Sequence, residues 1–90
     1  MMLEFVNESV SVEVQVRRDG KTRPKAFSWR GQYYEIVSWG RESTDTTEDE
    51  RPVHCYLVQT AGPESWELCR DIQAGQWTLV RHWSSKYRTV

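Results

Sequence analysis

Two cysteines and two histidines carry the side chains that nucleophilic catalysis would need. A thiolate nucleophile requires a nearby base, which a Cys–His pair could supply. His54 and Cys55 are neighbours in an expected strand, so they point to opposite faces and cannot meet. His82 has the parity of Val80 rather than that of Leu79, and we expect it outside the core. Gly-rich phosphate loops and nucleophile elbows are missing from the sequence, so we expect no enzyme.

The same residues are poorly spaced for a metal site. Zinc ligands come in close pairs such as C-x-x-C, whereas Cys55 and Cys69 lie far apart in the sequence. The acidic segment 42–50 lacks the Asp-x-Asp-x-Asp-Gly order of a calcium loop. The expected strand register sets Cys55 across from Cys69, but a reducing cytoplasm argues against a disulfide. We therefore expect no metal, no cofactor, and two thiols that pack as small hydrophobic groups.

Tryptophans close to arginines offer a different chemistry, which is binding. Residues 29–30, 39–41 and 81–83 each combine the two types. An arginine over a ring is favourable, and the same pair can stack a base while it contacts a phosphate. The alternative is that the tryptophans cover the ends of a barrel while the arginines keep the surface soluble. The candidate binding residues are Arg30, Tyr33, Trp39, Arg41, Arg81 and Trp83.

These candidates leave two classes of partner open. The expected one is a protein or peptide that docks on an outer face running from Tyr33 to Trp39. The alternative is an accessory module for single-stranded nucleic acid, which would use the three arginines of the set and Trp83. Neither class involves a membrane, and we expect a monomer.

Length and composition bound the fold. Ninety residues suit one domain, and 38% hydrophobic with 28% charged residues is typical of a soluble globular chain. No apolar run approaches the roughly 20 residues that span a bilayer. The first residues do not resemble a signal peptide, so we expect a cytoplasmic location. Five tryptophans indicate a core built from a few large rings.

Charge is distributed unevenly. Segment 42–50 carries five acids and no base, and the rest of the chain adds up to +4. That excess is too small to indicate a nucleic-acid binder, whose basic residues normally concentrate on one face. Because segment 42–50 also lacks an apolar anchor, we expect a flexible acidic loop. Its carboxylates would fold over the basic face and compete with phosphate.

Period-two patterns predict six antiparallel strands. Valines alternate with polar residues over 10–17, a hairpin covers 27–36 and continues to Trp39, and three more strands follow at 53–60, 65–71 and 76–83. We expect a type II′ turn at Gly31-Gln32 with Trp29 opposite Tyr34. Turning at Arg30-Gly31 would set Trp29 opposite Gln32 and split the apolar set. The tail 84–90 has no core pattern and is expected to be loose.

A meander of short strands favours a small single-domain antiparallel barrel over residues 1–90, SH3-like or related, because closure removes exposed strand edges. Between the fourth and fifth strands, the register that keeps apolar side chains together sets Val58 opposite Trp66. The predicted core comprises Val12, Val14, Val16, Phe27, Trp29, Tyr34, Ile36, Tyr56, Val58, Trp66, Leu68, Trp77 and Leu79.

The central hairpin also carries a signature, P-x-x-F-x-W-R-G, from Pro24 to Gly31. Together with Trp39, the segment 66–71 and Trp77, it resembles an uncharacterised bacterial family of short domains. These domains are also similar to segments at the C-terminal end of Y-family polymerase-like mutagenesis proteins. The resemblance covers roughly residues 10–83. It implies one compact domain and no particular reaction, and it gives the nucleic-acid alternative a setting in DNA repair or mutagenesis.

Overall fold

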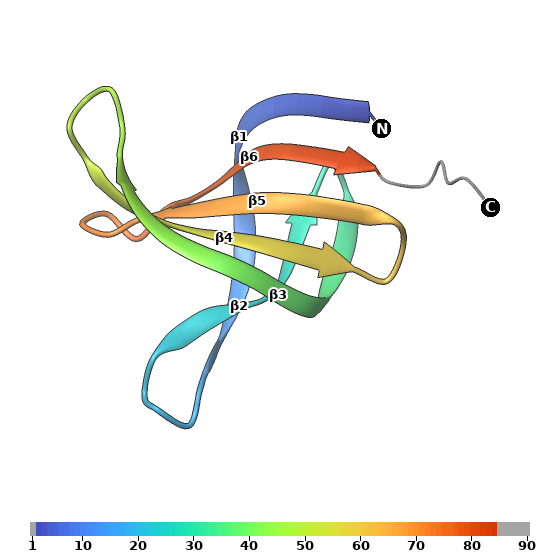
Figure 1. The fold of residues 1–90 in the computed structure, drawn as a ribbon, viewed down its shortest axis with the longest axis horizontal. Coiled ribbons are helices and arrows are strands. Elements are labelled where there is room, and N and C mark those ends of the chain that lie inside the picture. Colours follow the sequence, from blue (N-terminus) through green and yellow to red (C-terminus); the bar gives the residue numbers. More distant parts are fainter. Residues whose placement is uncertain (1, 85–90) are drawn as a thin grey trace.

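The computed structural model describes residues 2–84, which form six β-strands. The strands are β1 Met2–Val16, β2 Thr22–Trp29, β3 Gln32–Thr46, β4 Pro52–Thr60, β5 Glu64–Asp71 and β6 Trp77–Ser84. Each strand pairs antiparallel with the next, and β6 pairs with β1, so the sheet closes into a barrel (Figure 1). The predicted small all-β barrel of six strands is confirmed. Of the expected tail 84–90, Ser84 ends β6 and the remainder lies outside the described residues.

The barrel interior is filled by large rings and aliphatic side chains from alternating positions of β2 to β6. Trp66, Leu68 and Leu79 have no exposed surface, and the ring of Phe27 packs edge-on against that of Trp66 at 5.0 Å between centroids. Burying one such ring removes about 150–250 Å² from water, so a few of them stabilise a small core. Across the described residues, no helix is long and apolar enough to cross a membrane.

β1 and β3 are the two long strands, and each pairs with one neighbour at its start and with another at its end. β3 pairs with β2 over Gln32–Glu35 and with β4 over Ile36–Thr46. The prediction of a loop over 42–50 is therefore wrong for its first half, because residues 42–46 form a ladder with β4. Threonine and serine in this stretch suit a strand even though no apolar residue anchors it.

Two predicted core residues lie outside the core. Val14 is 49% exposed and Val16 is 71% exposed. Both keep the inward parity of β1, but they pair with Pro24 and Thr22 in a part of the β1–β2 hairpin that projects beyond the barrel (Figure 1). No other strand covers them there, so the valine pattern identified the strand correctly and overestimated the length that is buried.

Two β-bulges reverse the predicted side-chain faces further along the chain. Val37 is an extra residue of β3 that has no partner in the ladder with β4. It turns Trp39 inward, opposite Val58. An extra residue at Val80 in β6 likewise turns His82 inward, against the ring of Trp66. The outward positions predicted for Trp39 and His82 are wrong for this reason, since one inserted residue exchanges the two faces of a strand.

The turn of the β2–β3 hairpin also differs from the prediction. Phe27 pairs with Tyr34 and Trp29 with Gln32, so the chain turns at Arg30-Gly31. Both of these residues have positive φ, 49° and 78°, as a type I′ turn requires. The observed and the predicted register of this hairpin differ by two residues, and a shift of two leaves each side chain on the same face. The expectation that this turn would split the apolar set is therefore wrong.

Candidate nucleic-acid interface

The six predicted binding residues do not form one site. Arg41 and Arg81 do come together, because both line a small hollow on the outer face of the barrel. Trp83 lies beside them, with the guanidinium of Arg81 at 5.2 Å from the centre of its ring. Arg81 also forms an ion pair with Glu67 at 2.8 Å, so its charge is largely offset.

Arg30 lies elsewhere, at the β2–β3 turn. Its guanidinium forms an ion pair with Glu8 at 2.9 Å, faces Glu4 at 3.9 Å and stacks on Trp29 at 4.3 Å. The hydrogen bond from Arg30, followed by one from the Trp29 indole, lowers the pKa of Glu8. These contacts fix Arg30 as a structural residue of the turn. They leave it little free charge for a ligand.

Tyr33 and Trp39 are also separated from the arginine pair. Tyr33 is 57% exposed on the β2–β3 hairpin. The indole of Trp39 donates a hydrogen bond to the carbonyl of Pro24 at 2.7 Å, and Arg23 lies over its ring at 3.6 Å. An outer face running from Tyr33 to Trp39 is therefore not formed.

A different basic surface stands out, which we call the basic hairpin: residues 17–25 at the β1–β2 turn. It carries five lysines and arginines against the single acid Asp19 within nine residues. Figure 1 shows this hairpin projecting from the barrel. The net charge of the whole N-terminal half of the sequence is too small to indicate this cluster, whereas the net charge of residues 17–25 alone indicates it.

An open hollow of about 420 Å³ adjoins the basic hairpin. Lys21 reaches it from the hairpin, and Arg70 reaches it from β5. The rings of His54 and Tyr56 stack within it, 4.5 Å apart and nearly parallel at 3°. The remaining lining residues are Gly20, Thr22 and Glu42. A hollow of this size accommodates a nucleotide-sized group.

Among residues 2–84, Glu42 is the one carboxylate that lines this hollow. It accepts a hydrogen bond from Arg17 at 3.2 Å and lies 2.9 Å from Nε2 of His54. Burial raises the pKa of Tyr56, the Glu42 carboxylate raises it further, and Arg70 partly opposes both. Glu42 thus occupies the guanidinium of Arg17, which a phosphate would otherwise contact.

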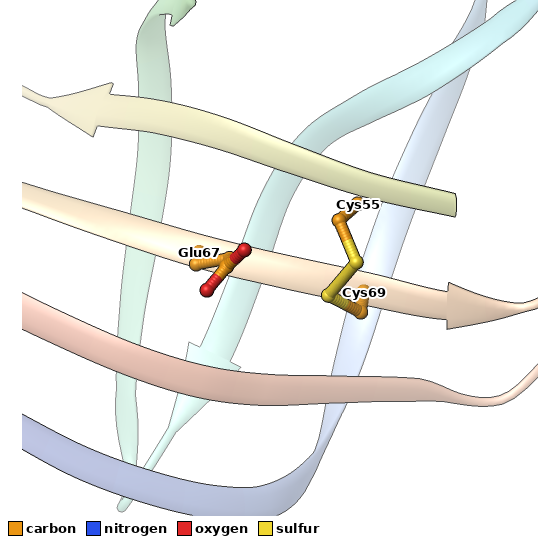
Figure 2. A group of neighbouring side chains, drawn as sticks. All are labelled: Cys55, Glu67 and Cys69. Atoms are coloured by element: carbon orange, nitrogen blue, oxygen red, sulfur yellow. A yellow bond between two sulfur atoms is a disulfide. The ribbon is translucent and has the colours of Figure 1, made fainter. Parts of the chain in front are cut away.

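Cys55 and Cys69 form a disulfide on the outer face of β4 and β5 (Figure 2). The expectation of two free thiols is wrong, because these residues are direct partners in the ladder and are close enough to join. The Glu67 carboxylate lies within 4.8 Å of both sulfurs. The disulfide form offers a metal no thiolate, and Glu67 is paired with Arg81. Cys55 also cannot pair with His54, which faces the other side of β4.

The side chain of His82 in β6 is largely enclosed, with 16% of its surface exposed. Its ring lies 5.2 Å from that of Trp29 and 4.7 Å from that of Trp66, and its Nε2 lies 3.0 Å from Glu4. Its Nδ1 is buried and has no hydrogen-bond partner among residues 2–84. Packing between two rings explains its position.

Comparison of the chain with protein-family models, with curated proteins and with solved structures gave no match.

Proposed function

We propose that this domain is a non-catalytic binding module for single-stranded nucleic acid, and that the strand crosses the basic hairpin and the adjoining hollow. One observation carries the proposal: five cations concentrated on a projecting hairpin beside a stacked pair of rings. Single strands are held by cations along the backbone and by rings on which the bases stack. The sequence offered the same function as an alternative, but with other residues.

The cations would contact the phosphates. Three cations of the basic hairpin, Arg18, Lys21 and Lys25, form no ion pair within residues 2–84. Lys21 also lines the hollow. Their charge is therefore available to a phosphate, and binding releases the counterions of the nucleic acid. Arg70 supplies a further cation across the hollow from Lys21.

The ring of His54, 34% exposed and stacked on the buried ring of Tyr56, would receive a base. A base on such a platform is held by its flat face, which all bases share, so binding depends weakly on sequence. The hollow is open rather than enclosed, and it suits a strand that passes through. The resemblance to segments of mutagenesis proteins gives this activity its proposed setting, in DNA repair in the cytoplasm.

Fluorescence anisotropy with a labelled single-stranded oligonucleotide at several salt concentrations tests the proposal. The double variant Arg18→Gln/Lys21→Gln should weaken binding and reduce the slope of log affinity against log salt by about 1.4, roughly 0.7 for each lost phosphate contact. The control is Arg51→Gln, which removes one exposed, ion-paired cation outside the hairpin, and its effect is compared per cation removed. No binding by the wild type, or an equal effect of the control, would refute it.

A protein partner is the second candidate, and a specific surface favours it. Leu3 and Phe5 of β1 are 50% and 67% exposed, and Leu3 pairs with Trp83 across the β1–β6 ladder. This apolar strip suits the apolar side chains of another protein. A Phe5→Glu variant would abolish such docking and leave oligonucleotide affinity unchanged.

A further inference from the structure

The Cys55–Cys69 disulfide lies between two hollows on the outer face of the barrel. The larger, of about 390 Å³, is lined by both cysteines. The smaller is lined by Cys55, together with Arg41, Arg81 and Glu67. Both cysteines are largely covered, yet their atoms form part of an open surface. The larger hollow therefore offers a small molecule a route toward the disulfide of the folded protein.

The charges on the two sides of the disulfide differ. Arg41 and Arg81 border Cys55 in the smaller hollow, and the Glu67 carboxylate there is ion-paired with Arg81. Within residues 2–84 no ion pair involves Arg41, so one positive charge beside Cys55 remains uncompensated. Asp45, Glu67 and Asp71 line the larger hollow, which both cysteines also line, and Asp71 is ion-paired with Arg51. Arg41 and Arg81 line the hollow that only Cys55 of the two cysteines borders. A negative charge on sulfur is accordingly more favourable at Cys55 than at Cys69.

We propose that Cys55–Cys69 is a thiol–disulfide exchange site for low-molecular-weight thiols. The incoming thiolate enters the larger hollow and attacks Sγ of Cys69. A new S–S bond forms to Cys69, the bond to Cys55 breaks, and its electron pair leaves on Cys55 as a thiolate. The step consumes one thiolate and releases one, so no further oxidant or reductant takes part. Arg41 stabilises the leaving thiolate.

The direction of attack follows from this asymmetry. Exchange is faster when the leaving sulfur carries its negative charge more readily. Attack on Cys55 would release the thiolate at Cys69, which lines the larger hollow, and the charged lining side chains of that hollow among residues 2–84 are the carboxylates of Asp45, Glu67 and Asp71. The mixed disulfide is therefore expected at Cys69, with Cys55 free. This inference concerns the outer face and does not depend on nucleic-acid binding.

Reaction of the full chain with glutathione as the probe tests the site. Free thiols are trapped with iodoacetamide, and peptide mass spectrometry then identifies the adduct on each cysteine. We expect glutathione on Cys69 and the alkyl group on Cys55, with the protein folded by circular dichroism. Arg41→Gln should slow the exchange roughly threefold to tenfold. Glu35→Gln, which removes an exposed charge of β3 outside both hollows, should leave the rate unchanged.

Three results would overturn the proposal. The first is glutathione mainly on Cys55. The second is an equal rate for Arg41→Gln and the wild type. The third is a disulfide that reacts only after unfolding in denaturant, which would show that the larger hollow does not admit a thiol. Because Arg41 is exposed, the variant is expected to fold, and its circular dichroism spectrum verifies this.

Discussion

His54 of β4 lies directly opposite Arg70 of β5, and the next pair along the same ladder is Cys55–Cys69. Successive pairs point to opposite faces of a sheet, so His54 and Arg70 line the hollow while the disulfide lies on the outer surface. The covalent bond thus fixes the register of the two strands that carry the ring platform and its cation. The proposed binding site and the proposed exchange site share these strands and occupy opposite faces.

The ring platform can be tested by removing its more exposed ring. Replacing His54 with alanine should weaken oligonucleotide binding by about 1–3 kcal/mol, the usual contribution of one stacked base. Anisotropy titration at fixed salt measures the change. The control is Tyr33→Ala, which removes an exposed ring outside the hollow. Equal losses in the two variants would contradict the assignment of His54.

Glu42 should oppose nucleic-acid binding, because it lines the hollow and holds Arg17 and His54. Glu42→Gln removes this charge, and we expect affinity to rise about threefold to tenfold at low salt, equivalent to roughly 1 kcal/mol of charge repulsion. Glu35→Gln, an exposed acid on the same strand but outside the hollow, should produce a smaller change. If both variants bind as the wild type does, Glu42 does not compete with phosphate.

The sequence was sufficient to predict the strand pairing where turn residues and apolar patterns agreed. The Ala61-Gly62-Pro63 connection and the apolar residues beside it predicted Val58 opposite Trp66, and the ladder confirms this register. The same register placed Cys55 opposite Cys69, but the expected compartment led to the wrong conclusion about the disulfide. Geometry was the more reliable guide to this bond than the presumed environment.

The bulges could not be predicted, because a single inserted residue leaves no mark on composition. Val37 and Val80 are both β-branched residues, and an unbroken strand fits them equally well. The register of the β2–β3 hairpin was undetermined for another reason: a shift of two residues preserves the faces. The ion pair between Arg30 and Glu8 in the observed turn depends on β1, which the local sequence does not show.

The left-handed backbone of Gly31 should make this position of the β2–β3 turn sensitive to substitution by any other residue. A Cβ there meets no atom within 4 Å, so any cost of Gly31→Ala comes from its φ of 78°. We expect the free energy of unfolding to fall by about 1–2 kcal/mol, measured by denaturant titration. Gly62→Ala provides the control, since its Cβ is also unobstructed and its φ is not positive. Similar losses in both would exclude backbone strain as the cause.

Asp71 should contribute a pH-dependent part of the stability. The hydrogen bond from Arg51, followed by one from the amide of Ala74, lowers the pKa of Asp71 in the folded state. Its contribution is therefore present at neutral pH and is lost as the pH falls through this lowered value, below about 4. Asp71→Asn should lower the free energy of unfolding at neutral pH and reduce its dependence on pH in the acid range, as measured by denaturant titration at several pH values. Glu48→Gln, on an exposed turn residue, should leave the profile unchanged.

Loss of the disulfide should destabilise the barrel without changing its fold. Cys55 and Cys69 are separated by 14 positions. Releasing a loop of that size gives the unfolded chain more conformational entropy, which lowers its free energy by about 3 kcal/mol at room temperature. The double variant Cys55→Ser/Cys69→Ser should therefore unfold at lower denaturant concentration while its circular dichroism spectrum stays the same. Adding a reductant should destabilise the wild type by a similar amount and leave the double variant unaffected. A wild type that is insensitive to reductant, or a double variant of equal stability, would show that the six-stranded ladder holds this register without the bond.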